Sequence, residues 1–306
     1  MILLVGAMTL TCCQKETPGP QSREVSIVAT LFPLYDFARQ ITGDKARVVL
    51  LLPPGVEAHS FEPRPGDLMS INKADLFLYT GNNMEPWVPK VLHAVDNKQL
   101  TVVDTSKGVK ALTSTKEHSE TEDVSHEGHS DVDPHIWLDF SDAQVMVDNI
   151  LNGLKNKDTR DFSLFLERAA GYQKRLEDLD QRFKNTLSHC DKHIFIHAGH
   201  SAFNYLANRY NLQYVSAYAG SPNAEPTPRR LIELKEIIRK NGIKYIYYEE
   251  LIRPRIAEVL SRETGVKLLK LNGAHNITKD EAAQGKTFID LMEENLANLK
   301  VGLECR

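Results

Sequence analysis

Four histidines lie where one expected element of this sequence ends and the next begins. His59, His200 and His275 each follow an apolar segment expected to be a strand, and His135 stands where a polar loop becomes apolar. Neutral imidazole is the commonest protein ligand for metals of the zinc class. A single histidine is more often a surface or hydrogen-bonded residue, but four in corresponding places predict a tetrahedral metal site with two ligands from each half of the chain.

Four further histidines lie near these. His118, His126 and His129 belong to a polar, charged tract within residues 113–132. Such a composition cannot offset its ordering entropy, so a mobile loop that holds weak outer ligands is expected. Alternatively, the loop is a solvated linker and His135 only caps a turn. His197 stands three residues before His200, and spacing alone does not decide between these two.

The types of candidate ligand and the motifs in the sequence indicate which metal is bound and whether the site is catalytic. Three or four imidazoles favour Zn2+ over Mn2+, which prefers oxygen ligands, although copper and nickel also bind imidazole. A catalytic zinc keeps one position open for water, whereas four histidines would close the site. The sequence has no His-Glu-x-x-His and no Gly-x-Ser-x-Gly motif. A binding protein is therefore favoured over a zinc hydrolase, and an adhesive role for the same fold stays open.

The elements that must position these histidines alternate between strand and helix. Unbroken apolar segments are typical of parallel strands, and residues 33–41 and 228–241 have helical spacing with proline in the first turn. The expected strands are 25–30, 47–52, 74–79, 100–104, 193–196, 213–216, 244–248 and 266–271. The expected helices are 33–41, 67–73, 85–95, 142–154, 162–187, 201–210, 228–241, 254–264 and one closing helix at 280–302.

This alternation predicts an α/β fold of two similar domains with parallel-rich sheets, joined by one long backbone helix. Ligands of open parallel sheets bind at the carboxyl ends of the strands, so the metal site is expected in the interdomain cleft. The predicted divisions are an N-terminal domain at 24–140, a helical linker at 141–188 and a C-terminal domain at 189–306. The long helix at 162–187 should also limit movement between the domains.

The composition and the N-terminal residues indicate the class of protein and where in the cell it is located. The chain has 306 residues, 42% of them hydrophobic, which is typical of a soluble globular protein. Its net charge of −4 and the lack of a basic stripe give no indication of nucleic-acid binding. Residues 1–13 resemble the apolar part of a signal peptide ending in a lipobox, with Cys13 as the lipidated residue or Cys12 as the alternative. Residues 14–23 read as a tether. A frayed apolar N-terminus is the competing interpretation.

Two other cysteines, Cys190 and Cys305, are far apart in the sequence. In an exported protein, an even pair of cysteines predicts a disulfide, here between the C-terminus and the start of the second half. Two free buried thiols are the alternative.

Four short motifs in both halves resemble the zinc/manganese class (cluster A-I) of substrate-binding lipoproteins of bacterial ABC importers. They are residues 55–63 (GVEAHSFEP), 133–139 (DPHIWLD), 200–206 (HSAFNYL) and 224–228 (AEPTP). The resemblance implies metal binding by His59, His135 and His200, because the motif around residue 200 selects that histidine over His197.

The resemblance fails at one point, because many relatives have an acidic ligand after the last strand and this chain has His275. His275 is therefore the expected fourth ligand, with water or Glu249 as alternatives. Glu225, Glu249 and His197 are expected to support the ligands from outside. The resemblance also implies a monomeric, exported, membrane-anchored lipoprotein of the zinc-specific branch. Such a protein captures Zn2+ for an ABC permease and is not an enzyme.

Overall fold

The computed structural model describes residues 24–113, 132–157, 160–218, 226–249, 251 and 254–306. Cys13, Glu225 and the three histidines of the polar loop lie outside these ranges. Among the described residues, no helix is long and apolar enough to cross a membrane.

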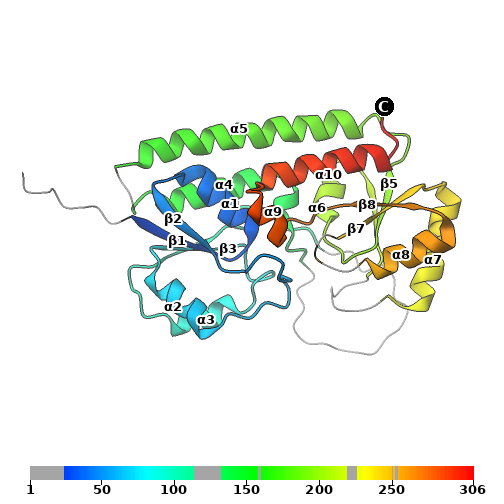
Figure 1. Cartoon of the computed structure of the whole chain (residues 1–306). Coiled ribbons are helices and arrows are strands. Elements are labelled where there is room, and N and C mark those ends of the chain that lie inside the picture. Colours follow the sequence, from blue (N-terminus) through cyan, green and yellow to red (C-terminus); the bar gives the residue numbers. More distant parts are fainter. Residues whose placement is uncertain (1–23, 114–131, 158–159, 219–225, 250, 252–253) are drawn as a thin grey trace, which may run out of the picture.

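The first half is one parallel sheet of strand order β2-β1-β3-β4. Helices α1 and α4 cover one face of this sheet, and α2 and α3 lie on the other (Figure 1). The bounds are β1 Val25–Ala29, α1 Phe32–Thr42, β2 Ala46–Leu50, α2 Pro65–Lys73, β3 Leu76–Tyr79, α3 Val88–Ala94, β4 Thr101–Asp104, the 3-10 turn η1 Ile136–Leu138 and α4 Phe140–Leu154.

The second half repeats this arrangement as a parallel sheet of order β6-β5-β7-β8. Its bounds are β5 Ile194–His197, α6 Asn204–Arg209, β6 Gln213–Ser216, α7 Pro228–Asn241, β7 Tyr245–Tyr248, α8 Arg255–Thr264, β8 Lys267–Lys270, α9 Lys279–Ala283 and α10 Phe288–Gly302. The expected class of two similar α/β units is confirmed. The domain limits stay a prediction, and α4, assigned to the linker, packs on β3 and β4 of the first sheet.

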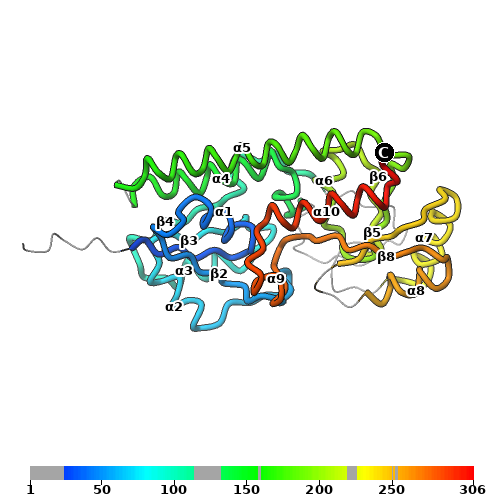
Figure 2. The backbone as a smooth tube through the Cα atoms, turned by 45° about the horizontal axis from the view of Figure 1, so that its top comes forward, coloured from blue at the N-terminus to red at the C-terminus, as the bar shows by residue number. Residues whose placement is uncertain are grey.

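Helix α5, Phe162–Leu187, runs along both halves (Figure 2). Its buried residues recur every three or four positions and pack against α1, α4 and α10. Polar contacts hold it to both halves, because the Tyr172 hydroxyl donates to Asp36 of α1 at 3.3 Å and Asp180 pairs with Arg209 of α6 at 2.6 Å. A single apolar core therefore joins the halves along this helix.

The expectation of one closing helix at 280–302 is wrong. Helix α9 ends at Ala283, Gly285 adopts a φ of +68°, and α10 begins after Thr287. Thr287 and Asp290 form a reciprocal capping box, which satisfies N–H groups at the start of α10. The N–H of Phe288 also donates to the buried carboxylate of Asp36 at 3.0 Å. These contacts stabilise a helix start where a continuous helix was expected.

The helix expected at 85–95 is also shorter, because α3 begins only at Val88. The Glu85 carboxylate lies at the ends of β1 and β3, where it accepts hydrogen bonds from the Thr30 hydroxyl and from the N–H groups of Thr80 and Gly81. Burial raises the pKa of Glu85 to about 7 against the opposing effect of these bonds. Glu85 therefore links the ends of β1 and β3 instead of extending α3.

In the second half of the chain, Cys190 and Cys305 form a disulfide. It joins the segment that follows α5 to the C-terminus, as the cysteine pair predicts.

Candidate metal site

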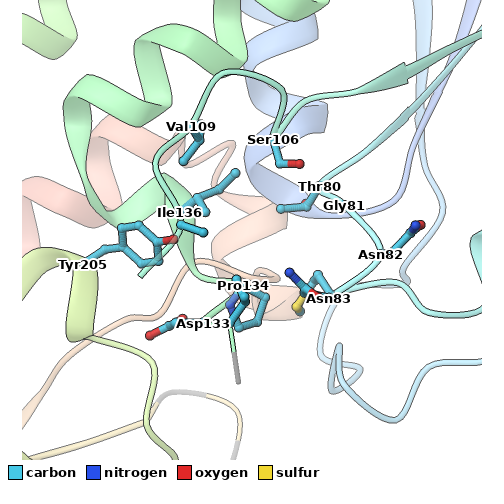
Figure 3. Close-up of a pocket in the computed structure, with 13 residues that line it drawn as sticks. Thr80, Gly81, Asn82, Asn83, Ser106, Val109, Asp133, Pro134, Ile136 and Tyr205 are labelled. Carbon is cyan, nitrogen blue, oxygen red and sulfur yellow. The ribbon is translucent and has the colours of Figure 1, made fainter. Parts of the chain in front are cut away.

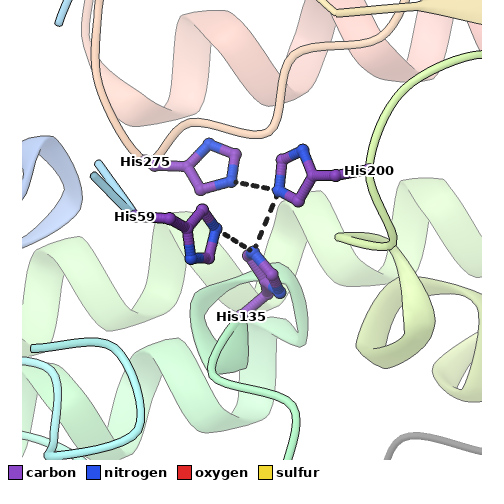
Figure 4. Close-up of side chains that lie close together, drawn as sticks. All are labelled: His59, His135, His200 and His275. Carbon is purple, nitrogen blue, oxygen red and sulfur yellow. Dashed lines mark hydrogen bonds between the residues drawn. The ribbon is translucent and has the colours of Figure 1, made fainter. Parts of the chain in front are cut away.

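The four histidines expected to bind a metal lie together at the junction of the two halves. His59 lies in the loop after β2, His135 directly precedes η1, His200 follows β5 and His275 follows β8. Their rings come from four separate segments and point toward one another (Figure 4). One nitrogen from each ring lies within 4.8 Å of the other three. The carboxyl-end rule for parallel sheets thus holds for the three histidines that follow strands.

Three of the six separations between these nitrogens match a tetrahedral zinc site. The Nε2 of His135 lies 3.2 Å from that of His59 and 3.3 Å from that of His200, which is 3.0 Å from that of His275. Metal–nitrogen bonds of about 2.0–2.1 Å in a tetrahedron separate neighbouring nitrogens by about 3.3 Å. The cluster therefore has the dimensions to surround one ion of this kind.

Two carboxylates determine which nitrogens face the centre. The Nδ1 of His135 lies 2.7 Å from Asp133, and the Nδ1 of His200 lies 2.5 Å from Glu249. Each carboxylate accepts a hydrogen bond from Nδ1–H, which leaves a lone pair on the Nε2 of the neutral ring. The Nε2 atoms of His135 and His200 then cannot hydrogen bond to each other at 3.3 Å. A cation between them would relieve this opposition of lone pairs.

Burial favours the neutral form of three of the four rings. It lowers the pKa of His59 to about 4, aided by the nearby His200, and lowers the pKa of His135 and His275 well below the ordinary value of 6.5. Burial opposes ionisation of Glu249, but the charge and hydrogen bonds of His200 outweigh it and lower the pKa of Glu249 to about 2. At neutral pH the site therefore offers neutral imidazoles at His59, His135 and His275, beside the ionised carboxylate of Glu249.

His197 is not one of the four convergent histidines. It is fully buried at the end of β5, its Nδ1 lies 3.3 Å from the carbonyl oxygen of His200, and its ring packs edge-on against Phe203. The structure thus places His200 in the cluster and His197 behind it. Gly199 between them is needed for space, since a Cβ there would lie 2.1 Å from the Glu249 carboxylate.

Asp133 is the residue whose role sequence reasoning missed. Its Oδ1 contacts the Nδ1 of His135, and its Oδ2 accepts from the Asn204 side chain at 2.8 Å. Burial raises the pKa of Asp133 to about 6, although hydrogen bonds from the N–H of His135 and the side chain of Asn204 act to lower it. Its position two residues before His135 in the motif Asp-Pro-His was the available signal.

A cavity of about 100 Å3 lies beside the site, on a different set of residues (Figure 3). Thr80 and Ser106 follow strands β3 and β4 and line it together with Asp133 and Tyr205, but none of the four histidines does. The cavity therefore borders the outer carboxylate of His135 and not the metal position itself.

Two parallel α/β units with a cluster of four imidazoles at their junction have the architecture of a two-domain metal-binding protein. Residues 27–302 match the model of the family described as "Zinc-uptake complex component A periplasmic", and the chain belongs to this family. It is a family of metal-binding transport proteins and not of enzymes.

Curated relatives agree with this assignment. The chain is 37% identical over 297 residues to the zinc-binding lipoprotein AdcA of Streptococcus pneumoniae strain R6, which covers 96% of this chain and 58% of that protein. It is 35% identical over 305 residues to the high-affinity zinc uptake system protein ZnuA of Bacillus subtilis strain 168, covering 98% and 94% of the two. The chain thus spans little more than half the length of the AdcA relative.

Solved structures share the fold. The Zn(II)-bound ZnuA-like domain of S. pneumoniae AdcA superposes with a TM-score of 0.78 at 35% identity, over 92% of this chain and 100% of that one. The laminin-binding protein Lmb of Streptococcus agalactiae superposes with a TM-score of 0.79 at 26% identity, over 92% of this chain and 100% of that one. Lmb is described as a bifunctional protein with adhesin and metal transporting activity.

Proposed function

We propose that this protein is an extracytoplasmic zinc-binding protein that captures Zn2+ and delivers it to an ABC permease for import. The observation that carries the proposal is the convergence of four imidazole nitrogens, three of whose separations are 3.0–3.3 Å. The metal is cargo, bound by His59, His135, His200 and His275. Membership of a zinc-uptake family supports the same conclusion.

Zinc is the proposed ion because the four convergent side chains are all imidazoles, whereas Mn2+ prefers oxygen ligands. Asp133 and Glu249 lie behind the ligands and supply up to two negative charges opposite the dication. This outer charge lowers the cost of burying Zn2+ without placing an oxygen in the coordination sphere. Manganese or iron binding by the same site is the alternative.

A binding role fits the site better than catalysis. Four protein ligands leave no open position for an activated water, and both neighbouring carboxylates are occupied by ligand imidazoles. Zinc-loaded protein should therefore show no hydrolase activity in a substrate screen.

The proposal extends to how the protein is held at the membrane. We infer a signal peptide at 1–13, lipidation at Cys13 and a tether at 14–23, with the folded part acting as a monomer beside its permease. Mass analysis of the mature protein from its native host tests the lipid, because Cys13→Ala should abolish the added mass.

The histidines at 118, 126 and 129 are proposed as accessory ligands. Deletion of residues 116–130 should leave one tight zinc site in calorimetric titration and remove only weak additional binding. Complete loss of tight binding would show that this segment holds a primary ligand.

An adhesive activity is a second candidate, supported by the structural likeness to Lmb, a laminin-binding protein with adhesin and metal transporting activity. Immobilised laminin tests it directly. Growth of a deletion strain under chelation tests import independently of adhesion.

The experiment that tests the main proposal uses protein purified without a histidine tag. We expect one Zn2+ per chain, retained against an excess of Mn2+, and much weaker zinc binding in His59→Ala, His135→Ala and His200→Ala. His93→Ala is the matched control, because His93 is exposed on α3. Tight zinc binding that survives all three site variants would refute the site.

A further inference from the structure

The loop that carries His275, residues Asn272–Ile277, has an unusual fixed conformation. Ala274 adopts a φ of +55°, and its N–H donates to the Asn272 side chain at 2.8 Å. A Cβ on Gly273 would lie 2.4 Å from the His275 ring. These constraints favour one shape of this loop, whose residues 272–276 are all buried.

This loop belongs to the second half of the chain but is bound by the first. The indole N–H of Trp137 donates to the Gly273 carbonyl at 2.8 Å, and the N–H of Phe32 donates to the His275 carbonyl at 3.1 Å. Trp137 lies two residues after His135, so the segments of these two ligands are fixed to each other.

The third connection goes to the loop of His59 and runs mainly through one side chain. Asn276 is fully buried, and its amide nitrogen donates to the carbonyl oxygens of Pro53 at 2.7 Å and Val56 at 2.8 Å. Its Oδ1 accepts the N–H of Ile277 at 2.8 Å. The N–H of Gly55 adds a bond to the Ile277 carbonyl at 2.8 Å. Both amide protons of Asn276 thus hold the turn that leads into His59.

His59 needs this support more than His135 and His200 do. His135 and His200 are oriented by carboxylates at Nδ1, whereas the only carboxylate bond at His59 within the described chain runs from its backbone N–H to Glu57. His59 is also the only partly exposed member of the cluster. The direction of its ring therefore depends on where its loop is held.

We propose that Asn276 is the positioning residue for His59, which fixes the His59 loop to the His275 loop so that both imidazoles reach the same ion. The proposal rests on the zinc-binding function proposed above. Outer-sphere partners of metal ligands typically contribute 10–100-fold to affinity. Asn276→Ala should therefore weaken zinc binding and speed zinc dissociation by at least about tenfold.

A double-mutant cycle separates positioning of His59 from a general loss of structure. Zinc affinity is measured by chelator competition in wild type, Asn276→Ala, His59→Ala and the double variant. Asn276→Leu repeats the cycle with similar volume but no donor. Asn97→Ala is the matched control, because the Asn97 side chain also donates to a backbone carbonyl, that of Ala74 at 2.9 Å, and accepts a backbone N–H, that of Gln99. These bonds lie before β3 and β4, whereas three of the four histidines follow the carboxyl ends of strands. Co2+ absorption of each variant reports the coordination geometry.

If Asn276 acts through His59, its replacement costs about tenfold in wild type and nothing further in His59→Ala. The cobalt spectra of the two single variants should also change in the same way, while Asn97→Ala keeps the wild-type spectrum and affinity. An equal loss in both backgrounds, or wild-type affinity in both Asn276 variants, would overturn the proposal. Failure of wild type to bind zinc would instead refute the proposed function.

Discussion

Replacement of His275 by alanine is the most demanding test of the four-histidine site, because here the chain differs from the acidic residue of many relatives. The ring is 6% exposed, and its Nε2 lies 3.0 Å from that of His200. Loss of outer partners costs up to about 100-fold in metal affinity, so loss of a direct ligand should cost at least about 100-fold, or about 2.7 kcal/mol.

The metal-free protein should respond much less. Alanine at this position leaves a cavity, which destabilises, but it also removes a buried polar ring whose Nε2 faces other imidazoles. These effects oppose each other, so we expect the free energy of unfolding to change by less than about 2 kcal/mol. A large loss of zinc affinity with a small loss of stability identifies a ligand.

The assay is chelator competition at neutral pH, with denaturant unfolding of the metal-free proteins alongside it. His275→Asp is the informative partner variant, because a carboxylate should keep zinc and improve manganese binding relative to wild type. If His275→Ala binds zinc as tightly as wild type, the four-histidine site is wrong and three histidines with water hold the metal. Glu249 is poorly placed to replace His275, since it accepts from both the Nδ1 and the N–H of His200.

The remaining predictions concern the supporting structure. Glu249→Gln should weaken zinc binding about 10–100-fold in competition titrations, because an amide no longer holds the Nδ1 proton of His200 as a carboxylate does. The pKa of His59 is about 4 in the folded metal-free protein and 6.5 ordinarily. Its contribution to stability is therefore present above pH 6.5 and lost as the pH falls through 4, by roughly 3 kcal/mol. Because burial also lowers the pKa of His135, His197 and His275, the measurement is the difference between wild type and His59→Ala in denaturant unfolding at pH 7, 5 and 4. Reduction of the Cys190–Cys305 disulfide should lower the free energy of unfolding by about 2–5 kcal/mol, and unchanged unfolding after reduction would contradict this. Scattering curves with and without zinc should coincide, because α5 packs on both halves; a large domain closure would refute that.

Local pattern was a good guide where the chain repeats one signal over many residues. Helix α5 runs from Phe162 to Leu187 as its apolar spacing predicts, because every third or fourth residue meets the core. The break between α9 and α10 was missed although Gly285 and the Thr287–Asp290 pair were visible. It is fixed partly by Asp36, which is 252 positions from Phe288 in the sequence. No local pattern contains that contact.

The sequence by itself determined the element order, the two α/β halves and the residue types of the site, because periodicity and turn chemistry act over short distances. Only the tertiary structure decided that four imidazole nitrogens lie within 4.8 Å of one another. It also decided the roles of Asp133 and Asn276, whose partners are fixed by how the two sheets are held together. The physical reason is that a site built from loops far apart in the chain takes its distances from packing along α5 and α10, and packing is a property of the whole fold.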